Sequence, residues 1–210
     1  DNKVNFMKYI IMADGEGKRW KNYNGLPKHL IPVDGEPIIK RTIDQIRSID
    51  DRGDIIITSH NESYEFEGAK RYEPESNHLE IDRFTEELIE DNICFLYGDT
   101  YYTDRCLCRI SEEDCGQLSF FGNEKSIVAV KIRCGEEFRK HKNIVRDLYI
   151  QGKIDNCIGW QVYQSYAGLE IGNDKKIGKY FINISQETFD INTPEDYLKS
   201  FGSIGRQNEY

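Results

Sequence analysis

The sequence predicts an α/β protein, in which helices cover both faces of an open, mostly parallel β-sheet. Four short apolar runs, at residues 9–13, 55–58, 93–97 and 127–132, are nearly continuous rather than alternating. Such runs are typical of parallel strands that are covered on both faces. Helical patterns separate the first three runs, and strands that alternate with helices are joined by right-handed crossovers.

The first helix is predicted to begin at Pro37, because proline is favourable at the first position of a helix. Its apolar residues recur every three or four positions, so that one face packs on the sheet. These residues are Ile38, Ile39, Ile43, Ile46 and Ile49.

A second helix is predicted between the second and third apolar runs. Asn77 and Glu80 are placed there as its N-cap and its third helical residue. Its apolar face comprises Ile81, Phe84, Leu88 and Ile89.

The second half of the chain is less regular. Residues 144–150 are predicted as a strand, 158–166 as a helix and 179–184 as a late strand. The last helix, at 194–201, has the clearest local signals. Thr193 is its predicted N-cap, Pro194 its first helical residue, and Asp196 completes a capping box.

Length and charge limit the classes of function. The 210 residues suit one domain, 1–210, in which residues 1–6 form a possible N-terminal extension. The formal net charge of −9 argues against a nucleic-acid or anionic-membrane binder. No apolar run approaches the roughly 20 residues of a membrane span, and the N-terminal segment lacks a signal-peptide layout. We therefore expect a cytoplasmic protein with inert, reduced cysteines.

A positively charged segment follows the first predicted strand. From residue 18 to residue 33 the chain carries Lys18, Arg19, Lys21, Lys28 and His29 but no Asp or Glu. Flexible backbone precedes it at Gly15 and Gly17, and glycines let backbone N–H groups approach a ligand closely. The pattern favours an anionic ligand, although a plain tight turn and a solvated lysine are the simpler explanations of its parts.

Carboxylates follow two later segments. Asp99 comes directly after the run at 93–97, so its side chain is expected at the carboxyl end of that strand. Asp190 and Asn192 stand two residues apart and face the same side if the segment is extended. Oxygen ligands of this kind suit Mg²⁺. The alternatives to a metal site are that Asp99 belongs to a simple Gly-Asp turn, and that Asp190 is solvated while Asn192 shapes the start of the last helix.

In this order, the motifs resemble those of the nucleotidyltransferases, which join a nucleoside triphosphate to a phosphorylated acceptor and release pyrophosphate. The chain reads I-I-M-A-D-G-E-G-K-R, then P-K-H-L, then D-G-E-P, followed later by G-D-T-Y-Y and I-N-T-P-E-D-Y. The resemblance covers most of the chain. It implies a single Rossmann-like, three-layer domain with a mostly parallel, mixed sheet.

The resemblance also implies roles for individual residues. Arg19 and Lys28 would hold the triphosphate as catalytic groups, and Mg²⁺ would be the cofactor. Its ligands would be Asp99 with Asp190 or Asn192. The nucleotide would be bound by the loop Ala13, Asp14, Gly15, Glu16, Gly17 and Lys18. Asp14 departs from the family pattern, which has a small residue there, so Asp14 either contacts the ribose or base or braces the loop.

The chain is most similar to the cytidylyltransferases of capsule and cell-surface biosynthesis. The resemblance therefore implies CTP and an acceptor of the phosphoglutamine, phosphocholine or sugar-phosphate kind, with no nucleic-acid or membrane partner. Two alternatives stay open: a metal-dependent glycosyltransferase, although an Asp-x-Asp pair is missing after residue 98, and a non-catalytic nucleotide-binding regulator.

Three segments are predicted to surround the substrates. Base contacts are expected from Ala13, Asp14 and the segment 59–64. The acceptor is expected near Tyr101, Tyr102 and Arg105. A further group of cations is either an acceptor-recruiting surface or a solvated segment: Lys131, Arg133, Arg139, Lys140 and Lys142.

Overall fold

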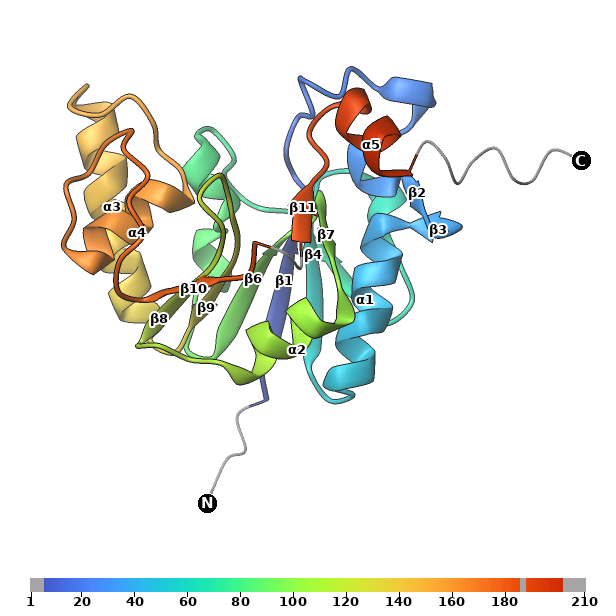
Figure 1. Ribbon diagram of the computed structural model, residues 1–210, viewed down its shortest axis with the longest axis horizontal. Helices are drawn as coiled ribbons and strands as arrows, with labels where there is room; N and C mark the ends of the chain where they lie inside the picture. Colours follow the sequence, from blue (N-terminus) through green and yellow to red (C-terminus); the bar gives the residue numbers. More distant parts are fainter. Residues whose placement is uncertain (1–5, 186–187, 202–210) are drawn as a thin grey trace, which may run out of the picture.

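A mixed sheet of seven strands forms the centre of the computed structural model, which describes residues 6–185 and 188–201 (Figure 1). The strands lie in the order β10-β8-β9-β6-β1-β4-β5, and every neighbouring pair is parallel except the two that involve β9. The predicted fold class is confirmed. The strands are β1 (Lys8–Met12), β4 (Asp54–Thr58), β5 (Lys70–Tyr72), β6 (Ile93–Tyr97), β8 (Leu118–Gly122), β9 (Ile127–Ile132) and β10 (Phe181–Asn183).

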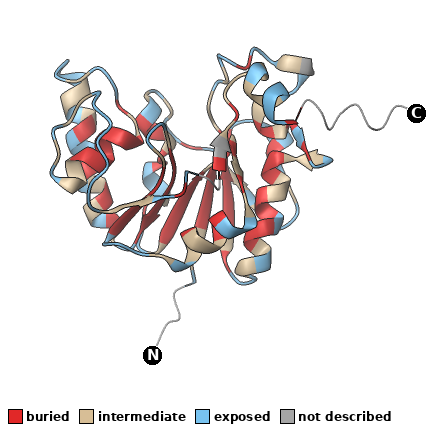
Figure 2. Ribbon diagram, in the orientation of Figure 1, coloured by how far each residue is buried: buried red, intermediate tan, exposed pale blue. Residues whose placement is uncertain are grey.

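Helices cover both faces of the sheet, whose central strands are almost entirely buried, whereas the edge strands β5 and β10 are partly exposed (Figures 1 and 2). One face packs against α1 (Ile38–Ile49) and α2 (Asp104–Glu112), and the other against α3 (Gly135–Ile150) and α4 (Gly159–Ala167). Side chains of a strand alternate between faces. Accordingly, Tyr9 and Ile11 of β1 lie in the first core, whereas Ile10 and Met12 lie in the second.

Strand β9 corrects one detail of the prediction, because it runs antiparallel to both β6 and β8. The reason is the tight turn that joins β8 to β9. In this turn the Asn123 Oδ1 accepts hydrogen bonds from the backbone N–H groups of Lys125 (2.8 Å) and Ser126 (3.0 Å). A turn this short can connect only antiparallel strands. As a result, the start of β9 lies at the same edge of the sheet as the end of β6.

The helix predicted between residues 77 and 89 is wrong. Two short 3-10 helices, η4 (Glu80–Arg83) and η5 (Glu86–Leu88), occupy this segment. The Asn77 amide donates to Asp14 instead of capping a helix. The Asp82 carboxylate accepts from the backbone N–H groups of His78 (3.1 Å) and Leu79 (2.9 Å) and so closes a tight local turn. Tertiary contacts therefore override the helical pattern.

The strand predicted at residues 144–150 is also wrong, because these residues form the end of α3. Two polar side chains, His141 and Lys142, lie on the buried face of this helix and interrupt its apolar period. Ile144 and Ile150 are exposed whereas Val145 is fully buried in the second core, so the segment faces the core with one side of a helix.

The later predictions are confirmed. The helix predicted at 158–166 is α4, and the late strand contains β10. The last helix, α5 (Pro194–Phe201), has the predicted bounds. Its capping box is complete: Asp196 N–H donates to Thr193 Oγ1 (3.1 Å), and Thr193 N–H donates to Asp196 Oδ2 (2.9 Å).

Short elements bring the segment after β1 and the last described segment of the chain together beside the sheet (Figure 1). Strand β7 (Thr100–Tyr102) pairs with β11 (Thr188–Asp190), and β2 (Pro32–Val33) pairs with β3 (Glu36–Pro37). A small third core includes Trp20, Ile31, Ile191 and Phe201, so it joins the positive segment to α5. In the described part of the chain, no helix is both long and apolar enough to cross a membrane.

Candidate active site

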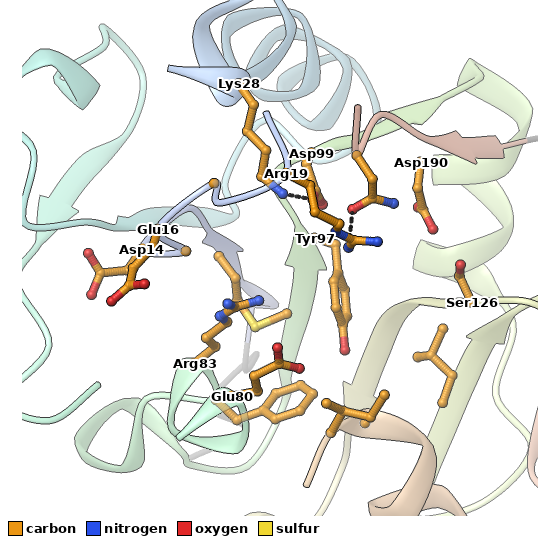
Figure 3. A pocket seen from close by; sticks show the side chains of 18 of the residues that line it. Asp14, Glu16, Arg19, Lys28, Glu80, Arg83, Tyr97, Asp99, Ser126 and Asp190 are labelled. Atoms are coloured by element: carbon orange, nitrogen blue, oxygen red, sulfur yellow. Dashed lines mark hydrogen bonds and ion pairs between the residues drawn. The ribbon is translucent and has the colours of Figure 1, made fainter. Parts of the chain in front are cut away.

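A cleft of about 400 Å³ lies at the carboxyl ends of β1 and β6 (Figure 3). Met12 and Tyr97, the last residues of these two strands, line its floor. This is the edge at which open parallel sheets bind their ligands. The loop after β1, the positive segment, η4, the β8–β9 turn and the start of α4 supply the other walls.

The glycine loop, residues 13–19, forms one wall. Gly17 has a φ of +60°, and its carbonyl accepts from the Trp20 N–H (2.9 Å). Gly15 lets the Arg83 guanidinium approach the loop closely, since a Cβ at Gly15 would lie 3.3 Å from Cζ of Arg83. The Glu16 and Lys18 side chains pair with each other in solvent (2.8 Å).

Asp14 braces this loop. Its carboxylate accepts from the backbone N–H of His60 (2.9 Å), contacts His60 Nδ1 (2.8 Å) and accepts from the Asn77 amide (2.8 Å). The Asn77 amide also donates to the Asp14 carbonyl (2.7 Å). Of the two roles predicted for Asp14, the structure thus shows the bracing contacts, which connect the glycine loop to the segments after β4 and β5.

Lys28 and Asp99 form an ion pair in the cleft (Figure 3). Pro27 precedes Lys28 at the start of η2 (Lys28–Leu30), and Asp99 follows β6. Burial by itself would raise the pKa of Asp99, but the Lys28 ammonium outweighs it and holds this pKa below its usual value. The positive segment and the distant carboxylate therefore meet at one edge of the sheet, as predicted.

His29 lies beneath this ion pair and is almost fully buried. Its Nδ1 is 3.1 Å from the Tyr64 hydroxyl. Burial lowers the pKa of His29 from its ordinary 6.5 to about 4, so the ring is neutral at neutral pH. The neutral ring therefore adds no positive charge to the Lys28–Asp99 ion pair at neutral pH.

Because His29 is buried in its neutral form, we expect the protein to lose stability in mild acid. In the unfolded chain this histidine is protonated below about pH 6.5, whereas in the folded chain it stays neutral down to about pH 4. The free energy of unfolding therefore falls as the pH falls from about 6.5 to about 4. The maximum loss is about 3 kcal/mol. Urea unfolding across this range should therefore show a flatter pH dependence for His29→Gln than for the wild type. Equal slopes would contradict the assignment.

Asp190 and Asn192 approach the cleft from the end of β11. The Asp190 carboxylate accepts from Thr100 Oγ1 (2.8 Å), and the Ile191 N–H donates to the Asp99 carbonyl (2.9 Å). Burial raises the pKa of Asp190, and the nearby negative charge of Asp99 raises it further. Asn192 Oδ1 accepts from the Arg19 guanidinium (3.0 Å), which directs Arg19 into the cleft.

The chemistry of these donors fits a hard divalent cation. Asp99 and Asp190 are close enough for one charge to disfavour the other, and a cation near both would relieve that repulsion. In the described residues, no group of three or more His, Cys, Asp or Glu side chains could hold a metal. A cation bound here would thus take its remaining ligands from water and from an anionic substrate. The roles predicted for Asp99, Asp190 and Asn192 stay predictions.

Several residues that line the cleft were not predicted from the sequence, among them Arg83, Lys125, Trp160 and Lys175. Arg83 of η4 places its guanidinium against Gly15, and within the described chain it has no carboxylate within ion-pair distance. Lys125 in the β8–β9 turn, Trp160 in α4 and Lys175 before β10 line the opposite end. The sequence carried no signal for them, because each belongs to a segment whose place depends on tertiary contacts.

The predicted acceptor residues lie elsewhere. Tyr102 is buried; its hydroxyl donates to the Val128 carbonyl (2.6 Å) and accepts from the Tyr97 N–H (2.9 Å). Tyr101 packs under the Arg41 guanidinium, 4.2 Å from Cζ to the ring centroid. Neither these tyrosines nor Arg105 lines the cleft.

The group of cations at residues 131–142 is likewise not a recruiting surface. Lys131 is buried and donates to the carbonyls that end α2, while Arg133 pairs with Asp114 (2.7 Å). Arg139 and Lys142 both pair with Glu86 (2.9 Å and 2.6 Å). Lys140 pairs with Glu137 (3.2 Å). The two pairs with Glu86 fix the η4–η5 segment on α3 and so hold Arg83 in place.

A second cavity of about 540 Å³ lies on the other side of the glycine loop. Ala13 and the segment after β4 line it, with Ser59, His60, Asn61 and Tyr64 among its walls. The segment predicted to contact a base therefore adjoins the glycine loop. Base contacts from Ala13 and this segment stay predictions.

Comparisons with known proteins agree with this architecture. No family model and no curated protein matches the sequence. Among solved structures, the chain is similar to CTP:phosphocholine cytidylyltransferase from Streptococcus pneumoniae, with a TM-score of 0.62 and 16% identity over 95% of this chain and 100% of that one. It is also similar to a putative glucose-1-phosphate thymidylyltransferase from Bacillus anthracis (TM-score 0.63, 15% identity, 97% of each chain). A third is the inositol-1-phosphate CTP transferase from T. maritima (TM-score 0.56, 14% identity, 98% of each chain). At these identities, the likeness establishes a shared fold.

Proposed function

We propose that this protein is a Mg²⁺-dependent nucleotidyltransferase that joins a nucleoside triphosphate to a phosphorylated small molecule and releases pyrophosphate. The observation that carries the proposal is the convergence of Arg19, Lys28, Asp99 and Asp190 in one cleft at the carboxyl edge of the sheet. These residues come from three separate parts of the chain and match the motif resemblance. The fold shared with solved nucleotidyltransferases supports the same reaction.

The reaction needs positive charge more than it needs a base. An oxygen of the acceptor phosphate attacks the α-phosphorus, a P–O bond forms, and the bond to the β-phosphate breaks to release pyrophosphate. The acceptor phosphate is already ionised near neutral pH, since its second pKa is about 6. Two anions must nevertheless approach each other, so fixed cations and orientation supply the catalysis.

Each residue has a definite task in this scheme. Lys28, released from Asp99, offers a mobile ammonium to the phosphates, and Arg19 offers a guanidinium fork. Asp99 and Asp190 would hold Mg²⁺, with Asn192 as a further oxygen donor or as the support of Arg19. When bound, Mg²⁺ neutralises phosphate charge and fixes the geometry of the oxygens. Arg83, whose guanidinium lies against Gly15 in the same cleft, offers a further positive charge to the phosphates.

CTP is the proposed nucleotide, and the proposed setting is capsule or cell-surface biosynthesis in the cytoplasm. The support is the motif resemblance to cytidylyltransferases, together with two similar structures whose names specify CTP. The acceptor classes that the resemblance offers are phosphoglutamine-like, phosphocholine-like and sugar phosphates.

A panel assay tests the reaction. The protein is incubated with each of the common nucleoside triphosphates, Mg²⁺ and a set of phosphorylated acceptors, and pyrophosphate is measured. We expect release that depends on nucleotide, acceptor and Mg²⁺ together, with CTP preferred. Background levels of pyrophosphate for every combination would exclude this function, and hydrolysis of sugar nucleotides instead would favour a glycosyltransferase.

The close approach of Arg83 to Gly15 can be tested by substitution of the glycine. The side chain introduced by Gly15→Val would displace the guanidinium, so we expect kcat/KM to fall roughly tenfold, or about 1.4 kcal/mol. The same substitution in an Arg83→Ala background should cost much less, because the displaced group is already gone. Equal costs in the two backgrounds, measured by pyrophosphate release, would show that the contact does not matter.

A further inference from the structure

We infer that the acceptor carries a second anionic group in addition to its phosphate, and that Lys125 and Lys175 bind this group. The inference rests on the proposed function, which it deepens by naming the class of acceptor. Both lysines line the end of the cleft that lies away from the glycine loop. They come from segments far apart in the sequence, the β8–β9 turn and the loop before β10.

The loop that carries Lys175 is tied to α4 by buried amides. Gln161 Nε2 donates to the Gly172 carbonyl (2.8 Å), and Gln164 Nε2 donates to the Asp174 carbonyl (2.7 Å). Gln164 Oε1 also accepts from the Gly172 N–H (3.0 Å). Both glutamines are almost fully buried, so these hydrogen bonds are costly to break. Lys175, one residue beyond Asp174, therefore leaves from a fixed backbone position.

Contacts on Trp160 define where the Lys175 ammonium lies. It sits 5.4 Å from the centroid of the indole ring, and it donates to the Lys125 carbonyl. The indole N–H donates to the same carbonyl (3.4 Å). Phe181 stacks on Trp160 with centroids 5.5 Å apart and an interplanar angle of 16°. The turn, α4 and the loop thus meet around one carbonyl oxygen.

This arrangement disfavours a cationic acceptor. A quaternary ammonium group is recognised by an open aromatic face, usually with negative charge nearby. Here Phe181 stacks on the indole, the Lys175 ammonium lies over it, and Trp160 itself is only 3% exposed. A positively charged head group would meet the Lys175 ammonium instead of an open aromatic face, with the cation Lys125 also lining this end of the cleft.

The same arrangement favours an anion. In the described part of the chain, no carboxylate lies within ion-pair distance of either ammonium, although Lys176 next to Lys175 is paired with Asp174 (3.0 Å). An ammonium has three donors, and Lys175 uses one of them on the Lys125 carbonyl. Apolar side chains of Ile127 and Ile158 line the cleft as well, which suits a short uncharged body between the two anionic ends.

Acceptors that differ in charge test the inference. The wild type is assayed with CTP, Mg²⁺ and 3-phosphoglycerate, glycerol phosphate or phosphocholine, which present an anionic, a neutral and a cationic end. We expect kcat/KM to fall in that order. The Lys125→Gln/Lys175→Gln double variant should lose roughly tenfold for 3-phosphoglycerate while changing little for glycerol phosphate. Lys176→Gln is the matched control, because this lysine lies on the same loop outside the cleft.

Two results would overturn the inference: a wild-type preference for phosphocholine or glycerol phosphate, or a double variant whose kcat/KM falls no more for 3-phosphoglycerate than for glycerol phosphate. Binding separates this failure from failure of the proposed function. If no combination releases pyrophosphate, the thermal shifts with 3-phosphoglycerate and glycerol phosphate are compared at constant ionic strength. A larger shift with 3-phosphoglycerate that disappears in the double variant would support the anion site on its own, and equal shifts would exclude it.

Discussion

Asp99→Asn is expected to lower the rate of pyrophosphate release about 100-fold or more at saturating nucleotide and Mg²⁺. The substitution keeps the shape of the side chain but removes the negative charge that Lys28 now balances at the end of β6. A neutral amide is a weaker ligand for Mg²⁺, and it also leaves the ammonium without its partner. Both changes act at the place where phosphate charge must be neutralised.

Binding of Mn²⁺ in place of Mg²⁺, followed by electron paramagnetic resonance, supplies a second measurement that does not depend on turnover. We expect weaker Mn²⁺ binding by Asp99→Asn in the presence of CTP. The control variant is Asp44→Asn, which removes a surface carboxylate paired with Lys40 on α1 and far from the cleft. Turnover and Mn²⁺ binding at wild-type levels in Asp99→Asn would remove this residue from the site.

Lys28→Met has the second-largest expected effect, a loss of roughly tenfold or more in kcat/KM for the nucleotide, equal to about 1.4 kcal/mol of transition-state stabilisation. Methionine preserves the length of the side chain but cannot neutralise a triphosphate. Lys21→Met is the matched control, since Lys21 belongs to the same positive segment but lines neither cavity. Equal rates for the two variants would mean that Lys28 acts only as a partner of Asp99.

The same variant should change stability with a definite sign. Because Lys28 holds the pKa of Asp99 below its usual value, the ion pair stabilises the fold above that usual value, and the benefit disappears as the pH falls through the folded-state pKa. We therefore expect Lys28→Met to unfold at lower urea concentration than the wild type at neutral pH. The difference between the urea midpoints of the two proteins should become smaller at acidic pH. A difference that becomes larger there would contradict the assigned ion pair.

Local patterns were sufficient for much of the fold. The apolar runs at residues 93–97 and 127–132 coincide with β6 and β9, and the capping residues around Thr193 define α5. Continuous apolar runs can be buried on both faces only inside a covered sheet, and a capping box satisfies backbone groups within one turn. These signals depend on near neighbours, so they can be recognised from the sequence.

The end of the cleft that holds the glycine loop, Lys28 and Asp99 was predictable for the same reason. Parallel strands place the residues that follow them at one edge, so the loop after β1 and Asp99 after β6 had to lie close together. The Lys28–Asp99 ion pair shows that they do. The sequence alone thus determined the fold class and the edge of the sheet at which the positive segment and Asp99 meet, but not the direction of β9.

Only the tertiary structure decided how the remaining segments are used. Residues 77–89 carry a helical pattern, yet Asn77 bonds to Asp14 and Glu86 is held by two cations of α3, so the segment folds as 3-10 turns that present Arg83. The cations at residues 131–142 balance carboxylates of the same chain, whereas Lys125 and Lys175 remain at the cleft. Which charges pair depends on contacts between residues tens of positions apart, and no periodic pattern in the sequence encodes those contacts.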